Sequence, residues 1–372
     1  MRILFGGGGT GGHLYPGLAI ARAIVRLDPT VEPFFIGARR GIERDVLPQA
    51  GFPFELLDLH PLYRSQPWQN WRTVAGLGGA LRRVATIAAA SRPACAVGTG
   101  GYAAGALLAF AAGRRIPIAL QEQNSHAGMT TRVFSRVARE VYLGFPEAEA
   151  GLHQGAGVTY VDTGNPIEAP PSPRPSRDEA RRAWGFGADV RRVLLVFGGS
   201  QGARGINVPV GEWVAGGAPV GLGVIWGTGK GQYDDYKGLE SDRVRVRPYL
   251  APIADAYAAA DLAVARAGAM ATAELCAWGV PMLLVPLPTA AADHQTANAR
   301  ALGDAGAAVQ LPQAEFGAAR LAAEVERLLG DEARLAALAA GALARARPDA
   351  AAVIATRVLA LARARTRAVE RI

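Results

Sequence analysis

The sequence predicts an α/β protein with two Rossmann-like domains, each built on a parallel, doubly wound sheet. Short β-rich runs alternate with amphipathic segments throughout the chain, the pattern typical of such sheets. A proline-dense stretch over 164–177 interrupts this alternation, after which a strand, a glycine-rich turn and a helix begin again. We predict a first domain over 1–163, a linker over 164–190, a second domain over 191–346, and a last helix over 347–372 that could pack back onto the first domain.

The strand candidates follow from apolar and β-branched runs bounded by turn residues. Those of the first half are RILF, VEPFFIG, PFELLDL, ACAVGTGG, IPIALQEQ, EVYLGF and GVTYVDTG, and those of the second are RRVLLVF, LGVIWG, DRVRVRPY, LAVARAG, PMLLVP and AAVQLP. The first helix is expected to begin near Pro16, and the Ala- and Arg-rich end from Ala314 predicts two or three helices. Two such sheets facing across a cleft would bind a ligand at the carboxyl ends of their strands.

Composition narrows the class of protein. The chain has 372 residues and a formal charge of +8, which would suit nucleic acid, anionic lipid or a phosphorylated ligand. We find no nucleic-acid-binding motif, and the scarcity of Lys beside abundant Arg and Ala indicates composition bias. The two cysteines exclude a disulfide framework, and the first residues are too short an apolar run for a signal peptide, so we expect a cytoplasmic protein.

The stretch FGGGGTGGH contains a G-x-G-x-x-G pattern at Gly7, Gly9 and Gly12. This pattern is also typical of dinucleotide-binding turns, and Arg39 and Arg40 at the end of the next strand would suit NADP, so an NADP-dependent oxidoreductase stays an alternative. Glycines let backbone N–H groups approach an anion at the start of a helix, which favours phosphate or pyrophosphate.

His13 follows this glycine loop, where a pKa near neutrality would suit a general base. The stretch VGTGGYAAG forms a second glycine-rich loop after the fourth strand, and QEQN places Glu122 and Asn124 after the fifth. Helix capping is the alternative explanation for Asn124.

The second half repeats this arrangement. FGGSQGA is another candidate phosphate loop, and Glu274 lies in a helix that follows a strand ending at Arg266. A carboxylate there would suit the two hydroxyls of a ribose. Gln295 and Asn298 share a helix face and would suit a sugar, although Asp293 could simply cap that helix.

Taken together and in order, GGTGGH, GTGGY, QEQN, TGNP, FGGSQGA, RAGAMATAE and DHQTANA resemble the MurG family of glycosyltransferases, family 28. The resemblance implies the GT-B fold and an inverting transfer of N-acetylglucosamine from UDP-GlcNAc to the 4-hydroxyl of the muramyl sugar of lipid I, giving lipid II in peptidoglycan synthesis. We expect no cofactor, and no protein-bound metal because no Asp-x-Asp pair follows a strand. A nucleotide-sugar-binding protein without catalysis is a further alternative.

The resemblance also assigns residues. His13 would be the base, with Glu122 as its rival. The residues implied for UDP-GlcNAc are Thr10, Gly11, Gly12, Asn124, Ser200, Leu250, Gly268, Ala269, Met270, Glu274, Gln295 and Asn298. Those implied for the acceptor pyrophosphate are Gly8, Gly9, Gly100, Gly101 and Tyr102. Two positions depart from the family pattern: Glu168 replaces an arginine, which Arg204 or Arg266 could compensate, and Ala267 replaces a serine.

A lipid-linked acceptor requires access to a membrane. Aromatic, apolar and basic residues mix over 62–83, as is typical of an interfacial patch on an anionic leaflet, and an amphipathic helix packed on its own sheet is the alternative. The patch residues are Trp68, Trp71, Arg72, Leu77, Leu81 and Arg82. We expect a peripheral protein on the cytoplasmic face of the plasma membrane, with other proteins of cell-wall synthesis as candidate partners and nucleic acid excluded.

Overall fold

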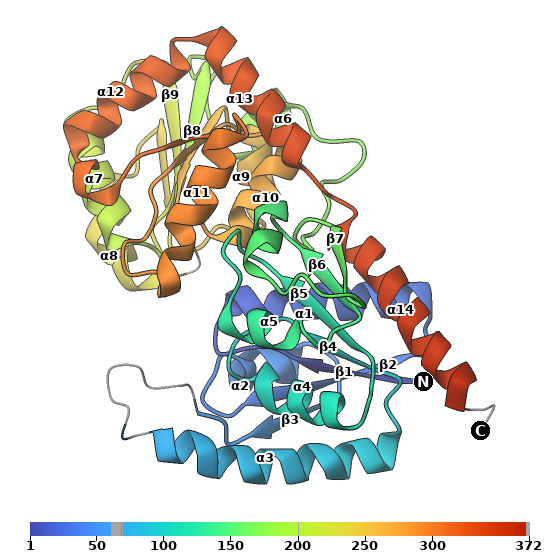
Figure 1. The fold of residues 1–372 in the computed structure, drawn as a ribbon. Coiled ribbons are helices and arrows are strands. Elements are labelled where there is room, and N and C mark those ends of the chain that lie inside the picture. The colour runs from blue at the N-terminus through green and yellow to red at the C-terminus, as the bar shows by residue number, and fades with distance from the viewer. Residues whose placement is uncertain (61–67, 69, 200, 370–372) are drawn as a thin grey trace. The chain divides into compact units, whose positions relative to one another are not determined.

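The computed structural model describes residues 1–60, 68, 70–199 and 201–369, and divides the chain into two units. The first unit comprises residues 1–168 and 348–372, and the second comprises 169–347. Each unit contains one sheet whose described strands are all parallel, seven in the first and six in the second (Figure 1). The α/β class expected from the strand–helix alternation is confirmed.

In the first sheet the strand order is β3-β2-β1-β4-β5-β6-β7, so the direction of winding reverses between β1 and β4. The strands are β1 (Arg2–Gly6), β2 (Glu32–Ala38), β3 (Phe54–Leu57), β4 (Cys95–Gly98), β5 (Ile118–Glu122), β6 (Glu140–Leu143) and β7 (Thr159–Asp162). The α-helices are α1 (Gly11–Leu27), α2 (Glu43–Val46), α3 (Asn70–Ser91), α4 (Ala104–Gly113), α5 (Met129–Phe134) and α14 (Ala350–Val369).

Alternating side chains of β1 supply both faces of this sheet, because successive residues of a strand point to opposite sides. Leu4 joins a core formed with α3 and α4, whereas Ile3 and Phe5 join a core formed with α1 and α14. Helix α14 follows the second unit in sequence yet packs against α1 of the first (Figure 1). The side chains that it buries there include Ile354 and Val358.

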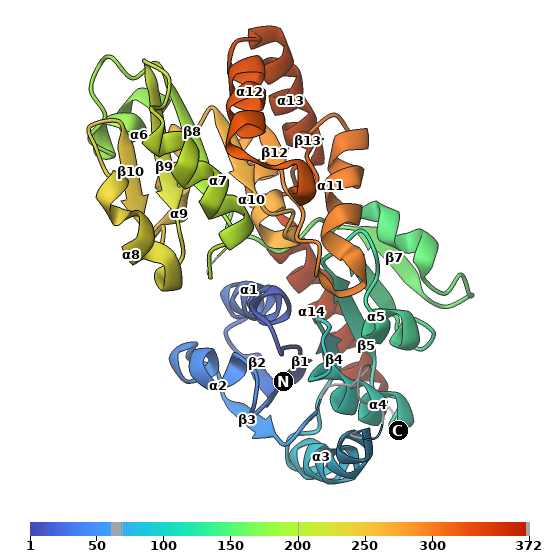
Figure 2. The same cartoon turned by 90° about the vertical axis from the view of Figure 1, so that its left-hand side faces the viewer.

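The second sheet has the order β10-β9-β8-β11-β12-β13 and reverses its winding between β8 and β11. Its strands are β8 (Arg192–Phe197), β9 (Leu222–Gly227), β10 (Val244–Arg247), β11 (Leu262–Ala265), β12 (Met282–Leu284) and β13 (Ala308–Gln310). Helices α7 and α12 pack together on one face (Figure 2). The α-helices are α6 (Arg177–Ala183), α7 (Arg204–Ala215), α8 (Tyr233–Tyr236), α9 (Ile253–Ala259), α10 (Ala269–Trp278), α11 (His294–Asp304), α12 (Ala318–Leu329) and α13 (Glu332–Arg345).

Much of the stretch predicted as a linker is built into the second unit. A capping box between Ser176 and Glu179 begins helix α6, and Arg181 donates to the buried carboxylate of Asp261 at 2.5 Å. Charge-assisted bonds to a buried acceptor hold this helix on the domain. The chain passes between the units at residues 168 and 169 instead.

Candidate active site

Three loops meet at the carboxyl edge of the first sheet, after β1, β4 and β5. The Gly8 N–H donates to the Gly100 carbonyl at 3.4 Å, the Thr99 hydroxyl donates to the His13 carbonyl at 2.7 Å, and the Gln123 amide donates to the Thr99 carbonyl at 2.8 Å. These loops follow strands on both sides of the winding reversal, where open α/β sheets bind their ligands. The structure therefore brings together the three motifs that the sequence singled out in the first domain.

The imidazole of His13 lies against the glycines that follow β4. A Cβ at Gly100 would stand 2.8 Å from the ring, and one at Gly101 would stand 2.1 Å from the Gly8 carbonyl oxygen. Both glycines also have a positive φ, 96° and 74°. His13 Nδ1 is 3.1 Å from the Thr10 hydroxyl, so the ring is held from two sides. A Cβ at Gly9 would stand 2.7 Å from the Tyr102 ring.

Helix α1 begins at Gly11, five residues before the start expected near Pro16. Proline is usually found in the first turn, and that preference led to the expectation. Pro16 instead lies inside the helix, and the N–H groups of its first turn belong to Gly11, Gly12 and His13. Thr10 is the N-cap residue, but its side chain contacts His13 and makes no cap hydrogen bond. The positive end of the helix therefore lies beside the imidazole.

Glu122 is buried, and backbone groups occupy both of its carboxylate oxygens. The N–H of Asn124 donates to Oε1 at 3.1 Å and that of Gly128 donates to Oε2 at 3.0 Å. A carboxylate held in this way orders the loop after β5 and is poorly placed to accept a proton from a substrate. Between the two candidate bases, the geometry favours His13.

Sequence reasoning missed Glu43, whose carboxylate is completely buried beneath the first glycine loop. Its Oε1 accepts from the Ala38 N–H at 3.1 Å, while its Oε2 is buried and has no hydrogen-bond partner among the described residues. A Cβ at Gly8 or Gly41 would stand 1.9 Å from this carboxylate. The signal available in the sequence was the cluster of glycines, which leaves room for a buried side chain as well as for a ligand.

In the second unit, Glu274 lies half-buried on α10 and accepts from the Tyr257 hydroxyl at 2.7 Å. Burial, together with the neighbouring carboxylate, raises the pKa of Tyr257 well above its ordinary value. Tyr257 therefore stays protonated and orients Glu274 near the carboxyl ends of β8 and β11. At the start of α10, Gly268 is the N-cap residue, and Ala269 and Met270 form the first turn.

The two amides predicted for a sugar differ in exposure. Asn298 is fully buried and donates to the Ala267 carbonyl at 3.1 Å, in the turn that precedes α10. Gln295 is half-buried, and its Oε1 accepts from the Leu287 N–H at 3.0 Å, which leaves its Nε2 group as a donor. Asn298 thus positions the turn, and Gln295 is the residue whose amide can reach a ligand.

The loops after β8 and β9 also pack closely. A Cβ at Gly202 would stand 2.0 Å from the Thr228 carbonyl oxygen, and one at Gly229 would stand 2.3 Å from the Gln201 carbonyl oxygen. Leu250 is buried against Gly227. Ser200, predicted to meet a diphosphate, lies outside the described residues.

The two arginines suggested to compensate for the missing arginine at position 168 differ in how exposed they are. Arg266 is buried and donates to the carbonyls of Val285 and Pro286 and to the side chain of Gln313. Arg204, at the first position of α7, is exposed. Arg204 is therefore the better placed of the two to meet a phosphate, whereas Glu168 is exposed at the end of the first unit.

The described part of the predicted membrane patch lies at the start of α3 and along it. Trp68 is 70% exposed, Leu81 is half-buried and Arg82 is exposed. Trp71, Arg72 and Leu77 belong to the same helix, and residues 61–67 lie outside the described part. None of the helices described is both long and apolar enough to pass through a bilayer. The same residues contain no group of three or more His, Cys, Asp or Glu arranged to hold a metal ion.

Two parallel α/β units with glycine-rich loops at both winding reversals define the GT-B class of glycosyltransferases. Two family models match the chain, the glycosyltransferase family 28 N-terminal domain over residues 3–143 and the family 28 C-terminal domain over 193–354. The chain belongs to glycosyltransferase family 28. The oxidoreductase alternative is thereby set aside.

Similar proteins cover the chain nearly from end to end. A protein of Salinibacter ruber, named UDP-N-acetylglucosamine–N-acetylmuramyl-(pentapeptide) pyrophosphoryl-undecaprenol N-acetylglucosamine transferase, is 42% identical over 97% of this chain and 96% of its own. A protein of Moorella thermoacetica with the same name is 40% identical over 94% and 96%. The crystal structure of Acinetobacter baumannii MurG matches with a TM-score of 0.75 and 27% identity, over 96% of this chain and 99% of that one.

Proposed function

We propose that this chain transfers N-acetylglucosamine from UDP-N-acetylglucosamine to N-acetylmuramyl-(pentapeptide) pyrophosphoryl-undecaprenol. The observation that carries the proposal is the end-to-end similarity to transferases named for that reaction, at about 40% identity. The site supports it, because the first unit offers an imidazole beside glycine loops and a helix start, and the second offers a carboxylate and an amide near another glycine loop.

In the proposed reaction the muramyl 4-hydroxyl attacks the anomeric carbon of the donor sugar. His13 accepts the hydroxyl proton through Nε2 as the new glycosidic bond forms, and the bond to UDP breaks with both electrons leaving on the phosphate. Attack from the face opposite UDP inverts the anomeric configuration and needs no covalent intermediate. If Nδ1 carries the proton and donates a hydrogen bond to the Thr10 hydroxyl, the productive tautomer is fixed, because Nε2 then carries the lone pair.

The glycine loop at Gly8, Gly9, Gly100 and Gly101 would bind the acceptor pyrophosphate. Its backbone can approach an anion closely, and the start of α1 adds a positive dipole end. In the second unit, Glu274 would bind the ribose hydroxyls and Gln295 the donor sugar. The first turn of α10 would bind the diphosphate and stabilise charge on departing UDP.

An acceptor that carries an undecaprenyl chain lies in a membrane. The protein would therefore bind peripherally to the cytoplasmic face of that membrane. Trp68, exposed beside the basic helix α3, supports this placement. Proteins of the cell-wall machinery are candidate partners there.

The test is acceptor-dependent UDP release, measured with UDP-N-acetylglucosamine and a short-chain analogue of the acceptor, with and without EDTA. We expect release only when both substrates are present, and we expect it to continue in EDTA. UDP-N-acetylglucosamine binding without turnover of any muramyl acceptor would instead favour a nucleotide-sugar-binding protein. Absence of both binding and turnover would contradict the proposal altogether.

A further inference from the structure

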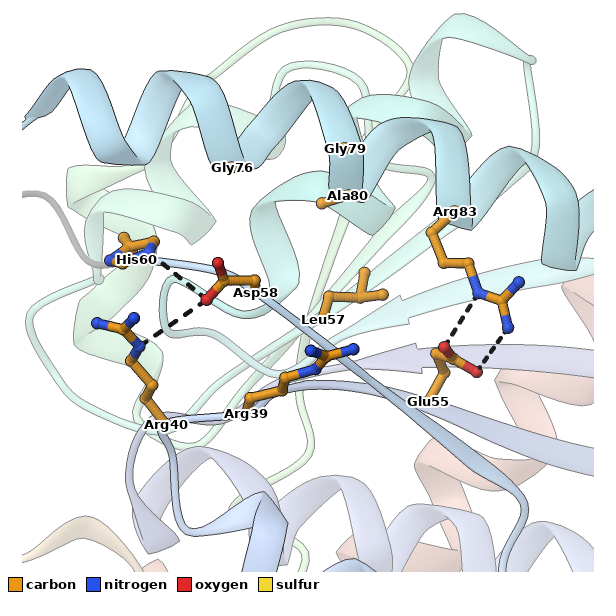
Figure 3. A pocket seen from close by; sticks show the side chains of 10 residues that line it. All are labelled: Arg39, Arg40, Glu55, Leu57, Asp58, His60, Gly76, Gly79, Ala80 and Arg83. Carbon is orange, nitrogen blue, oxygen red and sulfur yellow. Dashed lines mark hydrogen bonds and ion pairs between the residues drawn. The ribbon is translucent and has the colours of Figure 1, made fainter.

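A cavity of about 790 Å³ lies in the first unit between helix α3 and the ends of strands β2 and β3 (Figure 3). Its residues come from three segments: Arg39 and Arg40 after β2, Glu55 to His60 along β3 and beyond, and the α3 face that carries Gly76, Ala80 and Arg83. None of these residues belongs to the site proposed for the reaction. The volume is that of a typical small-molecule site.

Side chains of both charges line this cavity. Arg83 and Glu55 form a bidentate pair at 3.0 and 3.2 Å. Asp58 lies 3.8 Å from Arg40 and 3.5 Å from the buried His60 (Figure 3). The Arg40–Asp58 separation is too long for a strong hydrogen bond, so Arg40 can reorient toward a ligand.

Arg39 also lines the cavity. Its Nε donates to the Leu56 carbonyl at 3.1 Å, which fixes the guanidinium at the cavity while its terminal nitrogens remain as donors. Arg40 is exposed beside it. Each of these guanidiniums can bind a carboxylate through paired hydrogen bonds, and Asp58 and Glu55 can accept from ammonium or amide groups.

The cavity shares its edge of the sheet with the glycine loop. Strand β2 lies between β3 and β1, and Arg40 precedes by three residues Glu43, whose carboxylate packs beneath Gly8. Because neighbouring strands are about 4.8 Å apart, the ends of β3 and β1 are separated by roughly 10 Å. An extended peptide of five residues spans up to about 17 Å and can bridge that distance.

We propose that this cavity binds the peptide portion of the acceptor, with Arg39 and Arg40 binding carboxylates of the peptide. The inference rests on the proposed function, whose acceptor carries a pentapeptide attached to the muramyl sugar. A phospholipid headgroup fits less well, because two carboxylates line the cavity and its apolar wall is little more than Leu57 and Ala80. A ligand that carries both acidic and N–H groups matches the lining in full.

The test compares two short-chain acceptors, one with the pentapeptide and one with the bare lactyl group, in the wild type and in Arg39→Gln, Arg40→Gln and the double variant. We expect the double variant to raise KM for the peptide acceptor about tenfold, the effect of losing charge-assisted hydrogen bonds, and to leave KM for the peptide-free acceptor within about twofold. Arg22→Gln, an exposed arginine on α1, is the matched control and should change neither.

Arg40→Gln keeps the inference testable if Arg39→Gln disturbs folding, since the contact recorded for Arg40 is the distant pair with Asp58. Equal changes for both acceptors, or no change for either, would overturn the peptide site while leaving the transferase intact. Weaker binding to phosphatidylglycerol vesicles with unchanged acceptor selectivity would also overturn it, in favour of a membrane role. Failure of the wild type to use either acceptor would count against the proposed function itself.

Discussion

At the scale of single residues, the position of His13 depends on the absence of side chains around it. The ring occupies space that a Cβ at Gly100 would enter, and Gly101 lets the loop after β4 approach Gly8. The Thr10 hydroxyl, 3.1 Å from Nδ1, holds the ring from a second side. His13 is therefore oriented by its neighbours before any substrate arrives, which is the arrangement that the proposed proton transfer requires.

Replacement of His13 by Ala should lower kcat roughly a hundredfold, because general-base assistance typically contributes at least that much. Thr10→Val should cause a smaller loss, since the base remains but its tautomer is no longer fixed. Steady-state kinetics with both substrates would measure these effects, and Glu122→Gln is the comparison. If His13→Ala turns over normally while Glu122→Gln does not, the base has been assigned to the wrong residue.

Asp28 links the end of α1 to the last helix and should make the stability of the first unit depend on pH. Hydrogen bonds from Thr30 and Arg363 lower its pKa from 3.8 to about 2. A carboxyl whose pKa is lowered on folding stabilises the fold at pH values above its pKa in the unfolded chain. That contribution is lost as the pH falls through its pKa in the folded protein. Asp28→Asn should therefore flatten the fall in stability between pH 4 and pH 2.

Urea titrations at several pH values in that window would measure this dependence, with Asp242→Asn, an exposed aspartate of the second unit, as the control. A profile of Asp28→Asn that still falls as steeply as that of the wild type would show that Asp28 contributes nothing to it.

At the scale of elements, helix α3 has two different faces. The pocket side carries Gly76, Gly79, Ala80 and Arg83, which recur at helical spacing, while Leu81 lies about 100° from Ala80 around the helix. One helix can therefore cover the acidic and basic cavity and still present other residues outward. Trp68 is the most exposed large side chain described near its start.

Trp68→Ser should weaken binding to vesicles containing anionic lipid by about tenfold, because a tryptophan buried in the interface contributes a kilocalorie or more per mole. Binding of UDP should not change. Val220→Ser, at a 93% exposed apolar residue of the second unit, is the matched control. If Trp68→Ser co-sediments with vesicles as well as the wild type does, Trp68 does not contribute to membrane binding.

Strand positions were predictable from the sequence, whereas helix starts and buried polar groups were not. Every strand candidate corresponds to a strand among the described residues, since a buried parallel strand is a contiguous apolar run that local composition identifies. The start of α1 at Gly11 was missed because a glycine-rich first turn has low local helix propensity and is fixed by tertiary contacts.

Roles that depend on burial could not be predicted from the sequence either. Asn298 and Gln295 look equivalent along the helix, yet packing buries the first completely and leaves the second partly exposed. Glu43 reads as an ordinary surface residue of a charged stretch, and only the glycines of other segments create the space that encloses it. Such roles arise from non-local contacts, which no short pattern encodes.

At the scale of the whole molecule, each unit has cores of its own. Leu338 of α13 lies in the core of the second unit, while Ile354 of α14 lies in a core of the first, although the two residues are close in sequence. Ile354→Ala should destabilise the first unit by about 2–5 kcal/mol, and Leu338→Ala should destabilise the second by a similar amount.

Denaturation followed by probes in each unit would separate the two effects. Trp226 and Trp213 report on the second unit, and a label in the first unit would report on α14 docking. Equal shifts of both transitions by either substitution would mean that the units unfold as one.

The return of α14 to the first unit has a consequence for how the protein is made. The helix that covers α1 and the face of β1 is synthesised last, after the whole of the second unit. During synthesis, the first unit therefore keeps an uncovered apolar face at a stage when the second unit can already fold. A message that ends before residue 350 would yield a chain whose second unit is complete and whose first unit exposes an apolar face to chaperones and proteases.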